Sequence, residues 1–487
     1  MTDPRVQQAQ VYQQAKAAHA RRDYPRAIGL YRELLRRRPK DALLLRLMGA
    51  AELGAGDAAS AARHLESALK GDPRDAGGWA DLARARLIQT RLPEAVEAAE
   101  RAMAVDETAP SSLLVLAQCL CALGRTGEAE RRISSAVESA EDPMHPELAV
   151  AWALVCQRNG RPHDGLRRLA DMANETSSSP TLLYAIAELH ETAGEYERAW
   201  TLIERANRVA CPSFDVPRFV AEGHHVLEAW RSQEMGRLPR AGFETQRPLF
   251  IVGLPRAGLG LVEQILAAHP SVHASGTTNA ISMLASRLIA AVGAPSAPLH
   301  QRMGSLTQQL VDRAGAAYLT DTRQRHESAV RVVDRLPGGF TLVGWIRSML
   351  PGARIIHVLR DSLDTGASCY SRNTPARPRW TYDLNACGEA IRMDRAFMEH
   401  WATAYPDEPV HTICYESIVE DPDAEIRRLI EYAGLSWDDA CLKFYDSERI
   451  APASVFGDIR RPVHAKSVGR GEWYRPWLGP LIETLSR

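Results

Sequence analysis

Small and hydrophobic residues recur along the first two hundred residues with the spacing of amphipathic helices. One column of small residues has a period of 34 and shifts by two residues once, its members being Ala27, Ala61, Ala95, Ala129, Gly165 and Ala199. A second column lies seven residues further on, at Ala68, Ala102, Ala136 and Ala206. Two small-residue columns with a constant period predict repeated pairs of closely packed helices.

The 34-residue period resembles the tetratricopeptide repeat, in which each unit is a pair of helices. Small residues are needed where the two helices of a unit approach most closely, and Gly49 lies at such a position. Each unit leaves its neighbour-facing surface uncovered, so several units must stack into an α-solenoid. About six units fit between residues 8 and 208. We expect the array to bind a peptide or a partner protein on its concave face.

The pattern changes at residue 248. Short apolar runs rich in branched residues alternate with helical stretches, which predicts an α/β domain with a mainly parallel sheet and helices on both faces. The clearest runs are PLFIVGL, ARIIHVL and PVHTICY. A proline-rich segment interrupts the helical period before them. The sequence therefore predicts a repeat array over 1–208, a junction over 209–247 and an α/β domain over 248–487.

A glycine-bearing turn follows the first apolar run. In α/β sheets of this kind, ligands bind beyond the carboxyl ends of the strands, so this turn is a candidate site. Gly253 and Gly258 have the G-x-x-x-x-G spacing of a phosphate-binding loop. Leu259 and Gly260 replace the Lys-Ser/Thr pair that completes such a loop. The turn is therefore P-loop-like, but it is a poor match to an ATP or GTP site.

The stretches after the other two runs extend the pattern. RDSLDTGASCYSRN begins with Arg360 and carries Ser368, and YESIVEDPDAEIRRLIEYAGL follows the third run. Three further passages are VVDRLPGGFTLVGWI, LSWDDACLKFY and HAKSVGRGEWYRPWLGPLIETL. This ordered set resembles the sulfotransferase superfamily, most closely its bacterial branch with N-terminal tetratricopeptide repeats, which is related to tyrosylprotein sulfotransferases. The likeness covers nearly the whole chain.

The resemblance implies transfer of a sulfuryl group from the nucleotide PAPS to a hydroxyl or amine, which leaves PAP and needs no metal. It implies that Arg360 and Ser368 clamp the 3′-phosphate, for which a guanidinium supplies paired hydrogen bonds. An ion pair of Arg360 with Asp361 or Asp364 is the structural alternative. The resemblance also implies a C-terminal segment that closes over the nucleotide, with Lys466, Ser467, Gly469 and Arg470 as candidates.

The loop for the 5′-phosphosulfate departs from the family's usual P-R-S-G-T-T. The corresponding residues are Pro255, Arg256, Ala257, Gly258, Leu259 and Gly260. Backbone N–H groups at the start of the following helix still favour an anion. Each lost hydroxyl partner costs about 1 kcal/mol, or ~1.5–3 kcal/mol when the partner is charged. Leu259 also adds an apolar surface where a phosphate would approach, so we expect weakened donor binding.

The proton-accepting position differs as well. The family's base is a glutamate after H-x-x-G, and Thr277 stands at that place in VHASGTTNAI. A threonine cannot act as a base near neutral pH. His273, Asp334 and Glu263 are candidate replacements, and each has an ordinary structural alternative: packing or capping for His273, and a position along a helix for Glu263.

Cationic positions are retained. Arg335 replaces the lysine of the family's D-K-M-P, and with Arg256 it can stabilise charge on the leaving oxygen. Three interpretations remain open: an active PAPS-dependent sulfotransferase with a rearranged base and loop, an inactive relative that binds a nucleotide or peptide as a scaffold, and an enzyme that uses the arginines on another anionic substrate.

Composition adds little to these interpretations. The formal net charge is -1, so no global charge predicts binding to nucleic acid or to an acidic membrane. The 8 cysteines contain no C-x-x-C pair, which predicts mostly buried thiols and no structural zinc. MTDPRVQQAQ has no apolar signal core, and we find no run of about 18 apolar residues, so a cytoplasmic protein is expected. The sequence does not predict the oligomeric state.

Overall fold

The computed structural model of the protein describes two compact units. One contains Met1–Ala210 and Arg372–Pro378, and the other contains Cys211–Ser371 and Arg379–Arg487. The first unit is helical, and the second is built on a sheet. The described residues are 4–21, 23–89, 91–141, 144–173, 179–233, 237–294, 296–325, 327–374, 377–447 and 461–487.

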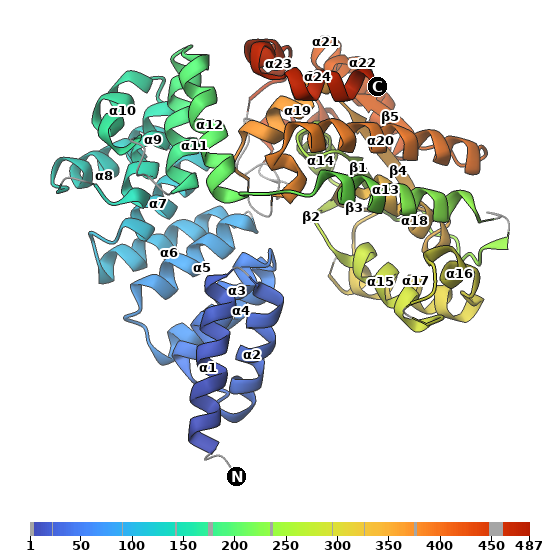
Figure 1. The fold of residues 1–487 in the computed structure, drawn as a ribbon, viewed down its shortest axis with the longest axis horizontal. Helices are drawn as coiled ribbons and strands as arrows, with labels where there is room; N and C mark the ends of the chain where they lie inside the picture. The colour runs from blue at the N-terminus through green and yellow to red at the C-terminus, as the bar shows by residue number, and fades with distance from the viewer. Residues whose placement is uncertain are drawn as a thin grey trace. The chain divides into compact units, whose positions relative to one another are not determined.

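Twelve helices, counted over the described residues of the first unit, pack as consecutive pairs (Figure 1). They are α1 (Pro4–Ala20), α2 (Tyr24–Arg37), α3 (Ala42–Gly54), α4 (Ala58–Gly71), α5 (Ala76–Ile88), α6 (Leu92–Val105), α7 (Pro110–Ala122), α8 (Thr126–Glu138), α9 (Pro146–Arg158), α10 (Pro162–Leu169), α11 (Pro180–Thr192) and α12 (Tyr196–Ala210). The predicted α-solenoid of helix pairs is confirmed.

The small-residue columns lie in the interior of this array. The column residues Ala27, Ala61, Ala95, Ala129 and Ala199 are all fully buried. A Cβ added to Gly49 would lie 2.7 Å from the Leu65 side chain, so glycine permits the approach of α3 to α4. Small residues therefore set the distance between the helices of a unit, as the period predicts.

Aspartates define where several of the repeat helices begin. A side-chain oxygen of each accepts a hydrogen bond from the backbone N–H three residues later, which satisfies a donor that the first helical turn leaves unpaired. These capping residues are Asp23, Asp41, Asp57 and Asp75. The start of each helix is thus encoded locally, independently of the packing of the array.

The last repeat of the first unit holds a short segment from the second half of the sequence. Arg372 pairs with Glu188 at 3.0 Å and with Glu191 at 2.6 Å. The guanidinium of Arg377 lies over the Tyr184 ring, 5.5 Å from its centroid. The tyrosine and the two glutamates share one face of α11 because they are four and seven residues apart. This helix therefore presents an aromatic and acidic face to two arginines.

The second unit contains a five-stranded, all-parallel sheet with strand order β2-β3-β1-β4-β5 (Figure 1). The strands are β1 (Pro248–Gly253), β2 (Val272–Thr277), β3 (Arg331–Pro337), β4 (Arg354–Leu359) and β5 (His411–Cys414). The three apolar runs of the sequence form β1, β4 and β5. Every residue of β1 is buried, in keeping with its central place. The predicted parallel α/β domain is confirmed.

Helices of the second unit connect and flank the strands. They are α13 (Val216–Arg231), α14 (Leu259–Ala268), α15 (Ala280–Ala291), α16 (Leu299–Gly304), α17 (Gln308–Arg325), α18 (Val343–Met349), α19 (Ser362–Ser371), α20 (Leu384–Ala404), α21 (Tyr415–Glu420), α22 (Pro422–Tyr432), α23 (Arg470–Tyr474) and α24 (Gly479–Ser486). Helix α13 occupies part of the junction predicted over 209–247. Its Trp230 is buried against Trp345 and Trp401.

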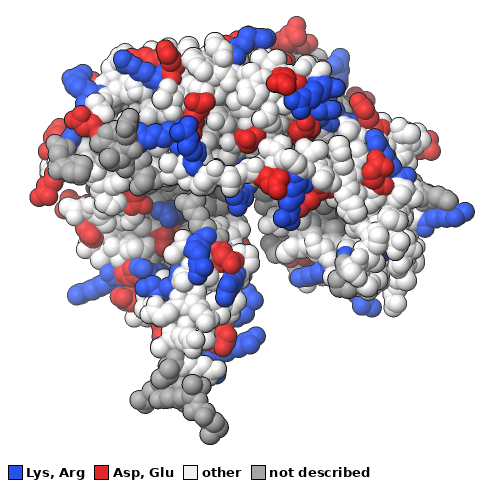
Figure 2. Space-filling model, in the orientation of Figure 1, with Lys and Arg blue, Asp and Glu red and all other residues white. Residues whose placement is uncertain are grey.

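The distribution of surface charge and the burial of the cysteines agree with what the composition predicts. Figure 2 shows lysine and arginine side chains interspersed with aspartate and glutamate on the face it draws. Most cysteines are buried, and Cys414 is exposed. None of the helices among the described residues is long and apolar enough to cross a membrane.

The close approach at Gly49 gives a stability prediction. We expect Gly49→Ala to lower the free energy of unfolding relative to Gly29→Ala by about 1–3 kcal/mol, the usual range for overpacking. Both changes improve helix propensity, but the new Cβ has nothing within 4 Å at Gly29 and meets Leu65 at Gly49. Urea unfolding followed by circular dichroism measures the difference. Equal stabilisation by both substitutions would contradict the prediction.

Candidate functional site

Parallel pairing gathers the carboxyl ends of three strands at one edge of the sheet. Gly253, the last residue of β1, is paired with Pro337 of β3 and with Val358 of β4. The loop after β1 and Arg360 after β4 therefore start from neighbouring points. Arg335 lies on β3, two residues before its end. The sheet thus brings together three of the predicted elements, of which the loop and Arg360 are 104 residues apart in the sequence.

Positive φ angles shape the loop after β1. Gly253 has a φ of 139°, and a Cβ there would lie 2.6 Å from the carbonyl oxygen of Val358. Gly258 has a φ of 108°, and a Cβ there would lie 2.8 Å from the Tyr415 ring. Arg256 is the one non-glycine residue with positive φ in the described part of the chain, at 71°. Both glycines are therefore required by conformation and by close neighbours.

The predicted 5′ and 3′ phosphate-binding residues contact one another directly. The Nε of Arg256 donates a hydrogen bond to Oγ of Ser368 over 3.0 Å. The Nη1 of Arg360 donates to the carbonyl oxygen of Arg256 over 3.1 Å. Residues predicted from two separate motifs therefore form a single cluster.

Arg360 is held by its own chain. It pairs with Asp364 at 3.2 Å, its guanidinium lies 5.1 Å from the centroid of the Tyr415 ring, and its side chain is only 5% exposed. It also donates to the carbonyl oxygen of Ser467. The ion pair named as the structural alternative is thus present with Asp364, and it coexists with the contact to the loop.

The predicted C-terminal residues join this cluster to different degrees. Ser467 contributes its carbonyl oxygen, and Gly469 donates its N–H to Asp364 over 2.9 Å. Arg470 is buried and donates to Oγ of Ser371 over 3.1 Å. Lys466 is exposed. Three of the four residues therefore contact α19 or Arg360 within the second unit.

The substituted loop positions differ in exposure. Ala257 and Leu259 are buried, at 2% and 3% exposed. Leu259 directs its Cδ1 toward Gly253, 3.5 Å from where a Cβ would lie. It therefore packs at the base of the loop. Gly260 is half-buried in the first turn of α14, where backbone N–H groups lack intrahelical partners.

Arg335 lies beside a fully buried carboxylate. Its Nε is 3.0 Å from Oε2 of Glu263, whose side chain is 0% exposed. Burial raises the pKa of Glu263 to about 7, against the opposing effects of Arg335 and the Gly276 backbone. Glu263 was predicted as one candidate replacement for the missing base, with an ordinary position along a helix as its structural alternative. Its signal was a single acidic residue in the apolar helix LGLVEQILAA.

Two predicted site residues, His273 and Thr277, lie near opposite ends of β2. Thr277 ends the strand, is exposed, and pairs in register with Arg335. His273 pairs with Val332, near the beginning of both strands. Four residues of strand span about 13 Å, so His273 does not lie with Thr277 at the carboxyl edge.

Asp334 faces away from Arg335 because successive strand residues point to opposite faces. Its Oδ2 accepts hydrogen bonds from the hydroxyls of Tyr318, over 2.8 Å, and Thr278, over 3.1 Å. Burial raises the pKa of this carboxyl, and it is 2% exposed. Asp334 therefore braces β3 against α17 instead of facing the loop.

The charges at this edge favour an anionic ligand. Three arginines from the loop, β3 and the end of β4 lie near the start of α14, where the helix dipole adds partial positive charge. The group that could hold a phosphate consists of Arg256, Arg360, Ser368, the backbone of Gly258–Gly260 and the C-terminal segment. In the described part of the chain no cluster of three or more acidic, histidine or cysteine residues could hold a metal ion.

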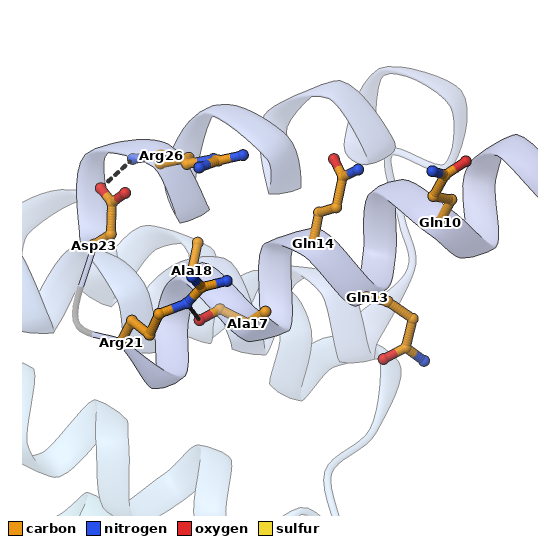
Figure 3. A pocket seen from close by; sticks show the side chains of 8 residues that line it. All are labelled: Gln10, Gln13, Gln14, Ala17, Ala18, Arg21, Asp23 and Arg26. Atoms are coloured by element: carbon orange, nitrogen blue, oxygen red, sulfur yellow. Dashed lines mark hydrogen bonds between the residues drawn. The ribbon is translucent and has the colours of Figure 1, made fainter.

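A separate cavity of about 380 Å³ lies in the first unit, between α1 and α2 (Figure 3). Its lining residues are Gln10, Gln13, Gln14, Ala17, Ala18, Arg21, Asp23 and Arg26. Asp23 caps α2 through the Arg26 N–H, and Arg21 donates to the carbonyl of Ala17. The lining contains none of the residues that the sequence predicts for phosphate binding.

Parts of both halves of the sequence match known protein families. Residues 248–439 match the sequence model of the Sulfotransferase family, and residues 12–76 and 46–112 match that of the tetratricopeptide repeat. The first match begins with β1 and includes the loop, Arg335, Arg360 and Ser368. It therefore covers the edge of the sheet where the arginines gather.

The individual proteins that resemble this chain have low sequence identity to it. An uncharacterized protein of Aquifex aeolicus is 26% identical over 404 residues, covering 80% of this chain and 52% of that protein. The protein-tyrosine sulfotransferase of Drosophila melanogaster is 24% identical over 260 residues, covering 49% and 48%. The chain thus spans about half the length of these curated relatives. The sulfotransferase domain of a Synechococcus olefin synthase has a TM-score of 0.31 and 18% identity, covering 48% of this chain and 97% of that domain.

The raised pKa of Glu263 predicts a pH-dependent stability. The carboxyl is protonated in the folded chain up to about pH 7 but ionises near its ordinary value of 4.5 on unfolding. The native state therefore binds more protons between these values, and stability falls as pH rises through this window. Relative to Glu263→Gln, the wild-type chain should lose up to about 3 kcal/mol between pH 4.5 and 7.

Urea unfolding at several pH values measures this difference. Glu483→Gln is the matched control, because Glu483 is 71% exposed and pairs with Arg487 at the chain's surface. Stability curves of wild type and Glu263→Gln that run parallel across the window would overturn the interpretation.

Proposed function

Because the chain carries a sulfotransferase-family domain together with tetratricopeptide repeats, we propose that it transfers a sulfuryl group from PAPS to a hydroxyl or amine. The acceptor we propose is carried by a peptide or protein that the repeat array binds. Binding of peptides is a common role of such arrays, and α11 already contacts Arg372 and Arg377 from the second half of this chain.

The contact of Arg256 with Ser368 and of Arg360 with the Arg256 carbonyl is the observation that carries this proposal. Arg256 is 112 positions from Ser368 and 104 positions from Arg360 in the sequence. These residues, which we assign to the two phosphate sites, nevertheless form one cationic cluster at the end of the sheet. A nucleotide with phosphates at its 3′ and 5′ positions is the ligand this cluster suits.

Each residue has a task in the proposed reaction. Arg360 and Ser368 would hold the 3′-phosphate, and Arg256 with the backbone amides that open α14 would hold the 5′ group. PAPS supplies the activated sulfuryl group. Arg335 stays charged and stabilises the oxygen of the leaving phosphate. Glu263 fixes the orientation of Arg335 through their ion pair. Its side chain is too buried to contact an acceptor itself.

Thr277 stands where the family's base is expected, and Asp334 is engaged elsewhere. We therefore propose that the acceptor's proton passes to water or to a carboxylate of the substrate. The new bond forms between sulfur and the acceptor's oxygen or nitrogen, and the bond from sulfur to the phosphate oxygen breaks. An acceptor amine of low pKa would meet this requirement most easily.

Binding of PAP tests the proposal. Calorimetry with the full chain should detect binding at micromolar to millimolar nucleotide, and Arg360→Ala should weaken it at least tenfold, because charged hydrogen bonds contribute ~1.5–3 kcal/mol each. Arg360→Lys keeps the charge without the fork and should give an intermediate loss.

Arg428→Ala is the matched control, since that side chain is 65% exposed and pairs with Glu425 on α22. It should leave PAP affinity unchanged. No detectable binding of PAP to the wild-type chain at millimolar concentration would refute the proposed function.

The loop substitutions give a second prediction. Gly260→Thr restores a hydroxyl at a half-buried position near the start of α14, and should tighten PAP binding by roughly ten- to a hundredfold, the value of one hydrogen bond to a charged group (~1.5–3 kcal/mol). Leu259→Thr should gain less, because Leu259 packs against Gly253 and its loss leaves a void. The same calorimetric assay compares them. Equal or weaker binding by Gly260→Thr would show that the loop does not contact the nucleotide's 5′-phosphate.

A further inference from the structure

One buried carboxylate joins two parts of the candidate site that lie a hundred residues apart. Asp364 is in the first turn of α19 and is 1% exposed. Its Oδ2 accepts from Nη2 of Arg360 over 3.2 Å and from the N–H of Gly469 over 2.9 Å. Its Oδ1 accepts from the N–H of Gly471 over 2.6 Å. Both oxygens of Asp364 are thus used, and each holds a part of the C-terminal segment.

The guanidinium of Arg360 is fixed from several sides. Asp364 pairs with it, the carbonyl oxygens of Arg256 and Ser467 accept from it, and Tyr415 packs beneath it. Its Nε has no hydrogen-bond partner among the described residues, although it is buried. The side chain is therefore preorganised and retains a buried donor.

The C-terminal segment is shaped to reach Asp364. Gly469 has a φ of 74°, which glycine adopts without strain. A Cβ on Gly471 would lie 2.7 Å from the backbone carbon of Leu363 and 2.9 Å from the nitrogen of Asp364. These are backbone atoms that cannot move aside cheaply. Glycine at 471 is thus what allows its N–H to approach the carboxylate.

The charge of Asp364 is essential to this arrangement. A carboxylate can accept from all three donors at once, and hydrogen bonds to a charged acceptor are about twice as strong as neutral ones. An asparagine amide would retain one acceptor oxygen and direct its own N–H groups at a second donor. Loss of the carboxylate would also leave Arg360 buried without its counter-charge.

We propose that Asp364 is a positioning residue that holds Arg360 and the segment Ser467–Gly471 as one anion-binding unit, so that order in the segment and affinity for the nucleotide are coupled. This inference rests on the proposed function for the identity of the anion. The coupling itself is a property of the chain, and it can be measured without any ligand.

Hydrogen–deuterium exchange of the full chain without nucleotide is the first test. In Asp364→Asn, the backbone amides of residues 467–474 should exchange at least about tenfold faster than in wild type. The reason is that the charge-assisted hydrogen bonds from this segment to the Asp364 carboxylate are lost. Asp361→Asn is the matched control: it removes the same charge three residues away, while its side-chain oxygen can still accept from the N–H of Asp364. Unchanged exchange in Asp364→Asn overturns the proposal.

A second variant guards against global unfolding of Asp364→Asn. Gly471→Ala leaves Asp364 and Arg360 intact but forces the segment away from α19. It should raise exchange over the same residues and weaken PAP binding in the same direction. Fast exchange in Gly471→Ala with wild-type affinity for PAP would overturn the coupling.

Addition of PAP separates positioning from a merely structural role. In wild type, saturating PAP should increase protection of residues 467–474, and in Asp361→Asn it should do the same. In Asp364→Asn, PAP should bind at least tenfold more weakly and, at saturation, should leave the segment unprotected. Equal protection by PAP in both aspartate variants overturns the proposal. Absence of PAP binding to wild type refutes the proposed function instead, and leaves the exchange test without nucleotide to decide the role of Asp364.

Discussion

The parallel pairing of β1 with β3 on one side and β4 on the other is the constraint on which the candidate site depends. It brings Gly253, Pro337 and Val358 into neighbouring register, and the loop, Arg335 and Arg360 follow from these points. Antiparallel pairing would send the next strand's end to the opposite edge. All-parallel order thus converts three separate motifs into one surface, the general reason that ligands of such sheets bind beyond the strand ends.

Each arginine at this edge of the sheet has a partner within the protein. Arg335 pairs with buried Glu263, Arg360 pairs with buried Asp364, and Arg256 donates to Ser368. Such partners offset part of the cost of desolvating a guanidinium and restrict its rotamers. The loop lacks the hydroxyls of the usual sulfotransferase pattern, so affinity for a phosphate would rest on these preorganised charges and on backbone amides at the start of α14.

The two halves of the sequence were predictable for different reasons. In the repeats, a constant period of small residues and capping aspartates encodes local geometry, and the same local solution recurs along the array. In the α/β domain, runs of branched residues identified the strands. The glycines at 253 and 258 were identified by spacing, and their positive φ angles and close neighbours give the physical reason for it. The roles assigned to Arg360, Ser368 and the loop residues remain predictions.

The sequence did not predict which side chains would pair with one another in the candidate site. Glu263 is separated from Arg335 by more than seventy residues, and the faces of α14 and β3 that meet are decided only when the helix packs on the sheet. His273 and Asp334 illustrate the reverse case: register places His273 near the beginning of β2, and the Asp334 carboxylate is engaged by the hydroxyls of Tyr318 and Thr278. Asp364 was recognised beside Arg360 in sequence, but its bonds to Gly469 and Gly471 arise from packing of the C-terminal segment.

The sequence by itself determined the repeat architecture, the parallel α/β class and the resemblance to sulfotransferases, because periodicity and motif spacing are local properties that survive without knowledge of contacts. Only the tertiary structure decided which carboxylates face the arginines, that Leu259 packs under the loop, and that the C-terminal segment is joined to Arg360 through Asp364. These features depend on side-chain direction and burial, which long-range packing fixes and residue order alone does not.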